Sequence, residues 1–167
     1  MVHPVRVHTE EHIRHVERLA REIYYPTYSP YVHQDHIEYF LVTFQSFEAI
    51  KRQIQSDFVY YLWMDKEKAI GYLGIQFEAK LAHLSKLYFL PDHRRLGLGK
   101  EAMNLTFQEV REKHLSQIRV VVNENNHGAI RFYQKHGFFI QESVTHSFEN
   151  GHSVQDLILL LSLSSQE

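Results

Sequence analysis

The chain contains no cysteine among its 167 residues, and its formal net charge is only −2. The absence of cysteine excludes disulfide bonds, thiolate metal sites and cysteine nucleophiles. Dedicated nucleic-acid-binding proteins are usually strongly basic, whereas here 18 Lys and Arg face 20 Asp and Glu. We therefore expect no nucleic-acid partner.

Long apolar runs are also missing. The apolar run at residues 157–161 has the length of a strand, and about 20 residues are needed to span a bilayer. Residues 1–11 are polar and lack the apolar core of a signal peptide. The length fits one ordinary domain, and 44% hydrophobic residues are enough for a core. We expect a single domain over residues 1–167, cytoplasmic and without a membrane partner.

Histidine and aromatic residues are abundant, with 13 His, ten Tyr and eleven Phe. The histidines are scattered, and no HExxH or comparable ligand spacing occurs. His12 and His15 are three residues apart but have no third ligand nearby in the sequence. We therefore predict solvated surface histidines and no metal site.

The first third of the chain has helical patterns. Thr9 is the predicted N-cap of a helix with apolar residues at helical spacing up to Ile23. Residues 24–31 are rich in tyrosine and contain two prolines, which make a continuous helix unfavourable, so we expect a loop. A helix with apolar residues at 37, 40, 41 and 44 follows, and Ser46 is the predicted cap of a third, short helix.

The rest of the chain alternates between strand and helix patterns. Residues 58–64 and 69–78 form a predicted hairpin, and Pro91 ends a third strand at 81–90. Residues 118–122 are a predicted apolar strand buried between helices. The remaining predictions are helices at about 98–114 and 126–136, and closing strands at 138–148 and 153–163 around an Asn-Gly turn. This order indicates an α/β or α+β fold with helices on both faces of a mixed sheet.

A glycine-rich basic turn connects the third strand to the helix that follows it. Its residues are Arg94, Arg95, Leu96, Gly97, Leu98, Gly99 and Lys100. Glycines let the backbone approach a ligand, and the free N–H groups and dipole of a helix start favour an anion. Three basic side chains add positive charge, so the turn suits a diphosphate. It matches neither GxxxxGK[ST] nor GxGxxG, so it is neither a P-loop nor a dinucleotide fingerprint.

A second motif lies about 27 residues after Gly99, in Asn126-His127-Gly128-Ala129-Ile130-Arg131-Phe132-Tyr133-Gln134-Lys135-His136-Gly137-Phe138. Together the two motifs resemble the GNAT superfamily of acetyl-CoA-dependent N-acetyltransferases. The first matches R-x-x-G-x-G, and the second matches N-x-x-A-x-x-F-Y-x-K-x-G-F. The resemblance extends over nearly the whole chain in the order of elements, with its specific motifs between residues 84 and 139.

The resemblance implies a largely antiparallel mixed sheet of about six or seven strands, in which strands four and five splay apart to admit the cofactor. It implies that the backbone of Leu87, Tyr88 and Phe89 pairs with the pantetheine arm and that residues 94–100 surround the pyrophosphate. It further implies that Asn126 contacts the pantetheine or acetyl end. Lys135 is assigned to the cofactor with this motif. The cofactor expected is acetyl-CoA.

Acetyl transfer needs a neutral amine, a polarised carbonyl and a proton for the departing thiolate. A backbone N–H near Tyr88 is the candidate to polarise the carbonyl, and Tyr133 is the candidate general acid. A core tyrosine packing with Ala129 and Phe132 is the alternative for Tyr133. Many relatives carry a glutamate base where this chain has His83, and histidine can also accept a proton. An exposed strand histidine is the alternative there, and Glu78 is a weaker candidate base.

The acceptor is expected to bind the N-terminal half, where the chain loosely resembles bacterial spermidine/spermine N-acetyltransferases. Aromatic faces hold alkylammonium groups by cation–π contact, so Tyr24 and Tyr28 are candidate substrate residues, with Glu38 adding negative charge. Simple packing of the tyrosines is the alternative. A polyamine is the leading acceptor; an aminoglycoside, an amino acid, a protein N-terminus or a non-catalytic acetyl-CoA sensor remain open. A homodimer through residues 157–161 is possible, and so is their burial as a strand.

Overall fold

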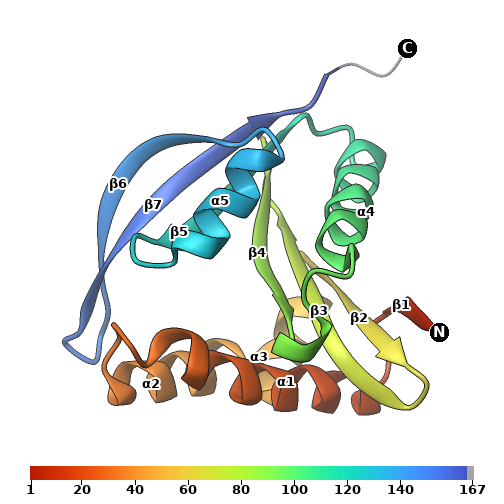
Figure 1. Cartoon of the computed structure of the whole chain (residues 1–167), viewed down its shortest axis with the longest axis horizontal. Helices are drawn as coiled ribbons and strands as arrows, with labels where there is room; N and C mark the ends of the chain where they lie inside the picture. Colours follow the sequence, from red (N-terminus) through yellow and green to blue (C-terminus); the bar gives the residue numbers. More distant parts are fainter. Residues whose placement is uncertain (165–167) are drawn as a thin grey trace.

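Seven strands form one mixed sheet in the computed structural model, which describes residues 1–164 (Figure 1). Their spatial order is β1-β2-β3-β4-β5-β7-β6, and every neighbouring pair except β4 and β5 is antiparallel. The strands are β1 (Val2–Arg6), β2 (Phe58–Asp65), β3 (Lys68–Phe77), β4 (Ala82–Phe89), β5 (Gln117–Asn123), β6 (Phe139–Ser147) and β7 (Ser153–Ser162). The predicted fold class is confirmed.

Five helices accompany the sheet: α1 (Glu10–Tyr28), α2 (Gln34–Phe44), α3 (Phe47–Gln55), α4 (Leu98–Glu112) and α5 (His127–Lys135). The predicted caps are confirmed, because Thr9 Oγ1 accepts a hydrogen bond from the His12 N–H at 3.1 Å and Ser46 Oγ accepts one from the Ala49 N–H. A 3₁₀ turn, η1 (Pro91–His93), leads from β4 towards α4.

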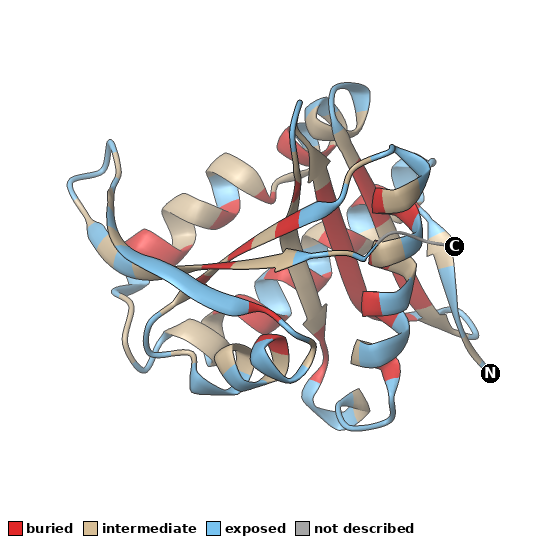
Figure 2. Cartoon of the chain, turned by 90° about the horizontal axis from the view of Figure 1, so that it is seen from above, coloured by how far each residue is buried: buried red, intermediate tan, exposed pale blue. Residues whose placement is uncertain are grey.

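The helices lie on both sides of the sheet. In Figure 1, α1, α2 and α3 form a layer below it, while α4 and α5 lie above. Figure 2 shows that the buried residues concentrate in the central strands and on the inner faces of the helices. Trp63, Tyr60 and Tyr72 are the largest fully buried side chains, so aromatic residues of β2 and β3 fill the centre of the core.

The prediction of a loop over residues 24–31 is wrong for its first part. Helix α1 continues to Tyr28 with Pro26 inside it. Proline removes a single backbone donor, and here it does so in the last turn of the helix. Tyr24 and Tyr28 lie one turn apart on the face that packs against Tyr88 of β4, with ring centroids of Tyr24 and Tyr88 5.1 Å apart. Burial of these rings on one helical face outweighs the local penalty of proline.

Strands β4 and β5 are the only parallel neighbours, and they pair over two positions only. Ala82 lies beside Ile118 and His83 beside Arg119; beyond these, no further pairing joins the two strands within residues 1–164. The predicted splay of the fourth and fifth strands is confirmed. The β5-facing backbone edge of β4 from Ser85 to Phe89 therefore faces no strand.

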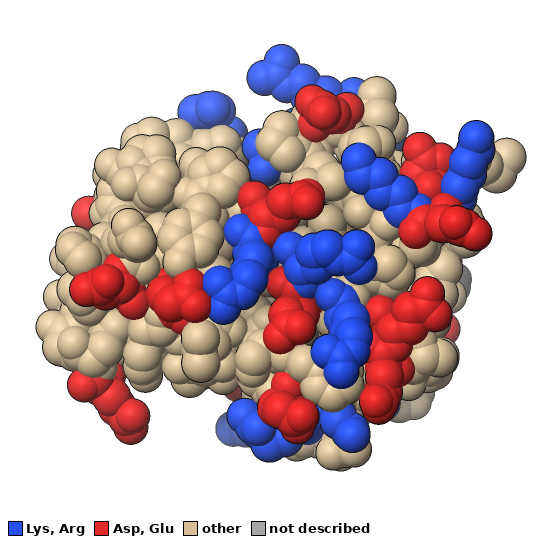
Figure 3. Space-filling model, turned by 90° about the horizontal axis from the view of Figure 1, so that it is seen from below, with Lys and Arg blue, Asp and Glu red and all other residues tan. Residues whose placement is uncertain are grey.

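Charged side chains mix on the outer helical face. Figure 3 shows Lys and Arg interspersed with Asp and Glu there, next to an area that is mostly uncharged. None of the helices within residues 1–164 is both long and apolar enough to cross a membrane.

Candidate active site

The glycine-rich turn has the backbone shape of an anion cradle. Arg95 and Gly97 have left-handed φ angles of 64° and 78°, and Gly97 is the N-cap of α4. The Glu101 N–H donates to the Gly97 carbonyl at 3.1 Å, so the N–H groups of Leu98, Gly99 and Lys100 precede the first intrahelical donor and have no acceptor within the helix. These donors, with the dipole of a 15-residue helix behind them, suit a phosphate.

The turn and the second motif form one packed unit. A Cβ on Gly99 would lie 2.8 Å from Cε1 of Phe132, so only glycine fits beneath this ring of α5. Asn126 is the N-cap of α5, and its Oδ1 accepts from the Ala129 N–H at 3.3 Å. The start of α4 thus packs against the second half of α5, so the two motifs of the sequence meet in the fold.

The basic residues of the turn differ in how they are held. Arg94 Nε donates to the Phe89 carbonyl at 3.0 Å, which ties the guanidinium to the end of β4. Arg95, Leu96 and Lys100 are exposed. Lys135, at the end of α5, is exposed as well. Arg94 therefore also has a structural role, in fixing where the turn leaves the strand.

A cavity of about 590 Å³ lies on the other side of the splayed strands. It is bounded by α1, α2, β4, β5, β7 and the end of β6. Its lining residues are Tyr24, Tyr28, Val32, His36, Ile37, Phe40, Gln76, His83, Ser85, Lys86, Tyr88, Arg119, Val121, Asn123, His146, Phe148, Val154, Asp156 and Ile158. Its size suits a small molecule.

A bulge in β4 sets which side chains enter the cavity. The register between β3 and β4 shifts where Gly74 pairs with Lys86 and Ile75 with Leu84, leaving Ser85 without a partner on β3. One extra residue reverses the alternation of side chains along a strand. His83 before the bulge and Lys86 and Tyr88 after it therefore all line the cavity.

The His83 imidazole is held neutral. Burial, followed by the charges of Lys86 and Arg119, lowers the pKa of His83 from 6.5 to about 3. Its Nδ1 accepts a hydrogen bond from Arg119 Nε at 3.3 Å. The lone pair at Nδ1 is thus already engaged, and the ring is a weaker base than a free histidine.

Lys86 is the one lysine that lines the cavity, and it has no carboxylate partner within residues 1–164. Its Nζ donates to Ser85 Oγ at 2.6 Å and lies 5.4 Å from the ring centroid of Phe40. Burial lowers the pKa of Lys86 from 10.5 to about 8. The cavity thus contains a cation that pairs with no carboxylate of residues 1–164.

The three predicted substrate residues do not lie together. Tyr24 and Tyr28 line the cavity, and Tyr28 Oη lies 2.6 Å from Tyr88 Oη. Glu38 does not line it: the carboxylate accepts two bonds from Arg21 at 2.8 and 2.9 Å and one from Tyr25 at 2.5 Å. These bonds lower the pKa of Glu38 to about 2. Glu38 therefore fastens α2 to α1 at the surface.

Tyr133 is buried on α5, with its ring 5.2 Å from Phe132 and 5.4 Å from Phe138. It is not part of the cavity lining. Burial raises the pKa of the Tyr133 hydroxyl above its usual value. The hydroxyl therefore stays protonated at neutral pH, which is the state that a proton donor requires.

Two further polar pairs at the cavity have no recognisable signal in the sequence. Arg119 of β5 forms an ion pair with Glu78, and both Arg119 and Val121 face the cavity, whereas Ile118, Val120 and Val122 are buried in the core. The prediction of a wholly apolar buried strand is thus wrong at Arg119, because β5 alternates between core and cavity. The second pair, His146 and Asp156 at 2.7 Å, places the one carboxylate in the lining.

Residues 14–138 match the family model described as Acetyltransferase (GNAT) family. The chain is 23% identical over 130 residues to spermidine N(1)-acetyltransferase from Thermoplasma acidophilum, covering 75% of this chain and 81% of that protein. Its fold is similar to that of the PaiA N-acetyltransferase from the same organism in complex with coenzyme A, with a TM-score of 0.82, 21% identity and coverage of 97% and 99% of the two chains. It is also similar to the ribosomal-protein-S18-alanine N-acetyltransferase from Escherichia coli, with a TM-score of 0.73, 15% identity and coverage of 100% and 97%.

The family model covers most of the chain, so the chain belongs to the GNAT acetyltransferase family. It is an acetyl-CoA-dependent N-acetyltransferase. The free edge of β4, the left-handed turn and the start of α4 fit the pantetheine and pyrophosphate of that cofactor.

Proposed function

We propose that the protein acetylates a primary amine of a small molecule that binds in the 590 Å³ cavity. The position of β4 carries this proposal. Tyr88 belongs both to the free strand edge expected to pair with pantetheine and to the lining of the cavity. An amine in the cavity and a thioester along the strand therefore meet at the same residues, which is the alignment that acyl transfer requires.

The cofactor supplies the acetyl group as a thioester and leaves as a thiol. We assign the pyrophosphate to residues 94–100 and the pantetheine to the backbone of Leu87, Tyr88 and Phe89, with Asn126 and Lys135 on the α5 side. A backbone N–H near Tyr88 is assigned to hold the carbonyl oxygen in the manner of an oxyanion donor. Tyr133 is assigned to give the departing sulfur its proton.

Loss of a proton from the acceptor amine is the remaining requirement. His83 is the predicted base, but a pKa of about 3 and the bond from Arg119 leave it little affinity for a proton. Lys86 offers an electrostatic contribution, because an unpaired cation in a partly desolvated cavity lowers the pKa of a neighbouring ammonium group. A lower acceptor pKa increases the fraction of neutral amine and reduces the demand on any base.

A polyamine is our first candidate acceptor. The aromatic rings of Tyr24, Tyr28 and Phe40 offer faces to alkylammonium groups, and Asp156 supplies a carboxylate in the lining. The distant similarity to a spermidine N(1)-acetyltransferase supports the same choice. In this arrangement a distal ammonium group pairs with Asp156 while the attacking amine lies nearer to Lys86.

An amine that also carries an anionic group, such as an amino acid, is the second candidate. Lys86 is the observation that favours it, because its charge lacks a protein partner in the described chain and a substrate carboxylate would provide one. The two candidates predict opposite effects of removing this charge. Lys86→Met should raise the KM of an anionic acceptor and should lower or leave unchanged the KM of a polyamine.

The decisive experiment measures thiol release from acetyl-CoA with spermidine, spermine, a set of amino acids, an aminoglycoside and a peptide with a free N-terminus. Thiol release with one class of amine would support the proposal, together with a product that carries one added acetyl group by mass spectrometry. Tight acetyl-CoA binding in calorimetry, with no release for any amine, would instead support a non-catalytic sensor.

A further inference from the structure

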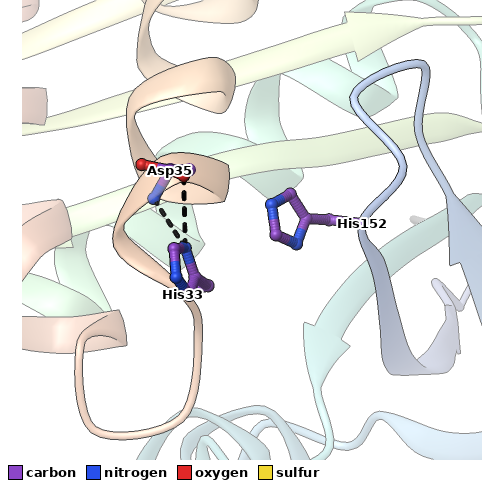
Figure 4. Close-up of side chains that lie close together, drawn as sticks. All are labelled: His33, Asp35 and His152. Atoms are coloured by element: carbon purple, nitrogen blue, oxygen red, sulfur yellow. Dashed lines mark hydrogen bonds and ion pairs between the residues drawn. The ribbon is translucent and has the colours of Figure 1, made fainter.

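Two histidines and an aspartate gather at the rim of the acceptor cavity. His33 is the N-cap of α2, Asp35 lies in the first turn of that helix, and His152 follows the turn between β6 and β7. Figure 4 shows the His152 ring pointing from the hairpin towards the pair on α2. One ligand atom from each residue lies within 4.8 Å of the others. The fold thus brings together groups that the sequence separates by more than 100 residues.

Local geometry explains only part of this cluster. His33 Nδ1 accepts a bond from the Asp35 N–H at 3.0 Å and lies 3.8 Å from Asp35 Oδ2, which is ordinary helix capping with a nearby acid. Capping does not require His152. Its ring stacks on His33 with centroids 5.3 Å apart and an interplanar angle of 20°, although stacked imidazoles contribute little by themselves.

The hairpin turn is already held in place against α2. Asn150 Oδ1 accepts from the His152 N–H at 3.1 Å, and Asn150 Nδ2 lies 3.3 Å from Nδ1 of His36 on α2. The ring of His36 in turn packs against Phe148, with centroids 4.7 Å apart. These contacts fix the backbone of His152 relative to the helix that carries His33 and Asp35.

We propose that His33, Asp35 and His152 bind a divalent transition-metal ion, with Zn²⁺ the best match to two imidazoles and one carboxylate. Zinc ligands lie about 2.0–2.2 Å from the metal, so tetrahedral ligand atoms are about 3.4 Å apart. Because the ligand atoms lie within 4.8 Å of one another, closing any separation in the cluster requires a movement of at most about 1.4 Å. Rotation of the side chains can supply it, because His33 and Asp35 are exposed.

Binding has a modest local cost and a defined structural consequence. His33 gives up its capping bond, which weakens the start of α2, while the metal joins the same turn of helix to the hairpin. The ion fastens β6–β7 to α2 beside His36 and Phe148, which both line the cavity. The metal site therefore lies where it would hold one wall of the acceptor cavity against the other.

The test is calorimetric titration of the EDTA-treated full chain with ZnCl₂, without acetyl-CoA or amine, so that its outcome is independent of the proposed function. We expect one saturable site per chain. We also expect the melting temperature to rise by about 5 °C or more when zinc is present at about 100 times its Kd.

Three variants locate the site. His152→Gln and His33→Ser should each weaken binding at least about tenfold, and serine keeps a capping hydroxyl at the start of α2. His8→Gln, an exposed histidine outside the cluster, should bind like the wild type. No saturable binding to the wild type, or unchanged affinity in both cluster variants, would overturn the proposal.

Discussion

The proposed cofactor side and the proposed acceptor side of this protein are built in different ways. The cofactor side consists mainly of backbone: a free strand edge on β4, a left-handed turn at Arg95 and Gly97, and the start of α4. The acceptor side consists of side chains from α1, α2, β4, β5, β7 and the end of β6. Backbone sites need particular glycines at particular spacings, so they are conspicuous in a sequence. Cavities lined by side chains leave no comparable pattern, because their residues come together only in the fold.

The largest effect is expected at Tyr133, the proposed proton donor. Tyr133→Phe removes the proposed proton donor but keeps the buried ring, so kcat should fall by about 10²- to 10⁴-fold. The Kd of acetyl-CoA, measured by calorimetry, should stay near the wild-type value. Unchanged turnover would show that Tyr133 is only a core residue of α5.

Lys86 provides the sharpest test of the acceptor side. Lowering its pKa from 10.5 to about 8 corresponds to ~3 kcal/mol of unfavourable free energy, so Lys86→Met should stabilise the fold by up to this amount at pH 7. Between pH 8 and 10.5, Lys86 keeps its proton in the unfolded chain but loses it in the folded protein. The free energy of unfolding of the wild type therefore rises over that range, and the difference in stability between Lys86→Met and the wild type narrows. Urea unfolding of both proteins at pH 7, 9 and 10.5 measures this difference.

The same variant also tests how the acceptor amine becomes neutral. Removal of the Lys86 charge should raise the pKa of the bound amine, so the acid limb of the kcat profile, which reports groups in the enzyme–substrate complex, should move to higher pH by ~1 unit. An acid limb that stays in place in Lys86→Met, but disappears in His83→Gln, would return the role of base to His83.

The backbone side is tested by a pair of glycine substitutions. Gly97→Ala places a Cβ at a φ of 78°, which costs ~1–2 kcal/mol and should weaken acetyl-CoA binding by about tenfold. Gly128→Ala is the matched control, since it lies in α5 with an ordinary φ and no atom within 4 Å of the added carbon. It should be neutral or stabilise the fold by up to ~1 kcal/mol. Equal effects of the two substitutions on stability and affinity would contradict a turn-specific role.

The smallest effect is expected at Glu38, which the structure places outside the cavity. Glu38→Gln should leave the acceptor KM unchanged and destabilise the fold by less than ~1 kcal/mol, because the pair with Arg21 is exposed. The folded pKa is depressed to about 2, so this contribution is present above pH 4.5 and is lost as the pH falls towards 2. A clear increase in acceptor KM would restore Glu38 to the substrate site.

The sequence predicted the fold and the glycine-rich turn between β4 and α4 because both rest on local signals. Thr9 and Ser46 are recognisable helix caps, Pro91 follows the end of a strand, and Gly97 allows the left-handed turn that begins α4. These signals depend on neighbours within a few residues, which a single sequence displays directly.

Three features escaped prediction because they depend on contacts distant in sequence. Pro26 stays within α1 because Tyr24 and Tyr28 pack on Tyr88, some 60 residues away. Arg119 enters the cavity because β5 alternates between core and cavity. Lys86 does so because a bulge shifts the register of β4, and a register shift is not readable from the spacing of apolar residues.

The brief pairing of β4 with β5 divides the sheet into two parts. One part consists of β1 to β4 and carries α1 and α2, and the other consists of β5, β7 and β6. Only two pairs of residues join them within the sheet over residues 1–164. Away from this pairing, the two parts are joined through their helices and turns. Phe132 of α5 packs on Gly99 at the start of α4, and His36 of α2 packs against Phe148 beside the β6–β7 hairpin. The cluster of His33, Asp35 and His152 is a further contact between α2 and this hairpin, so side chains far from the strand pairing help to set the distance between the two parts.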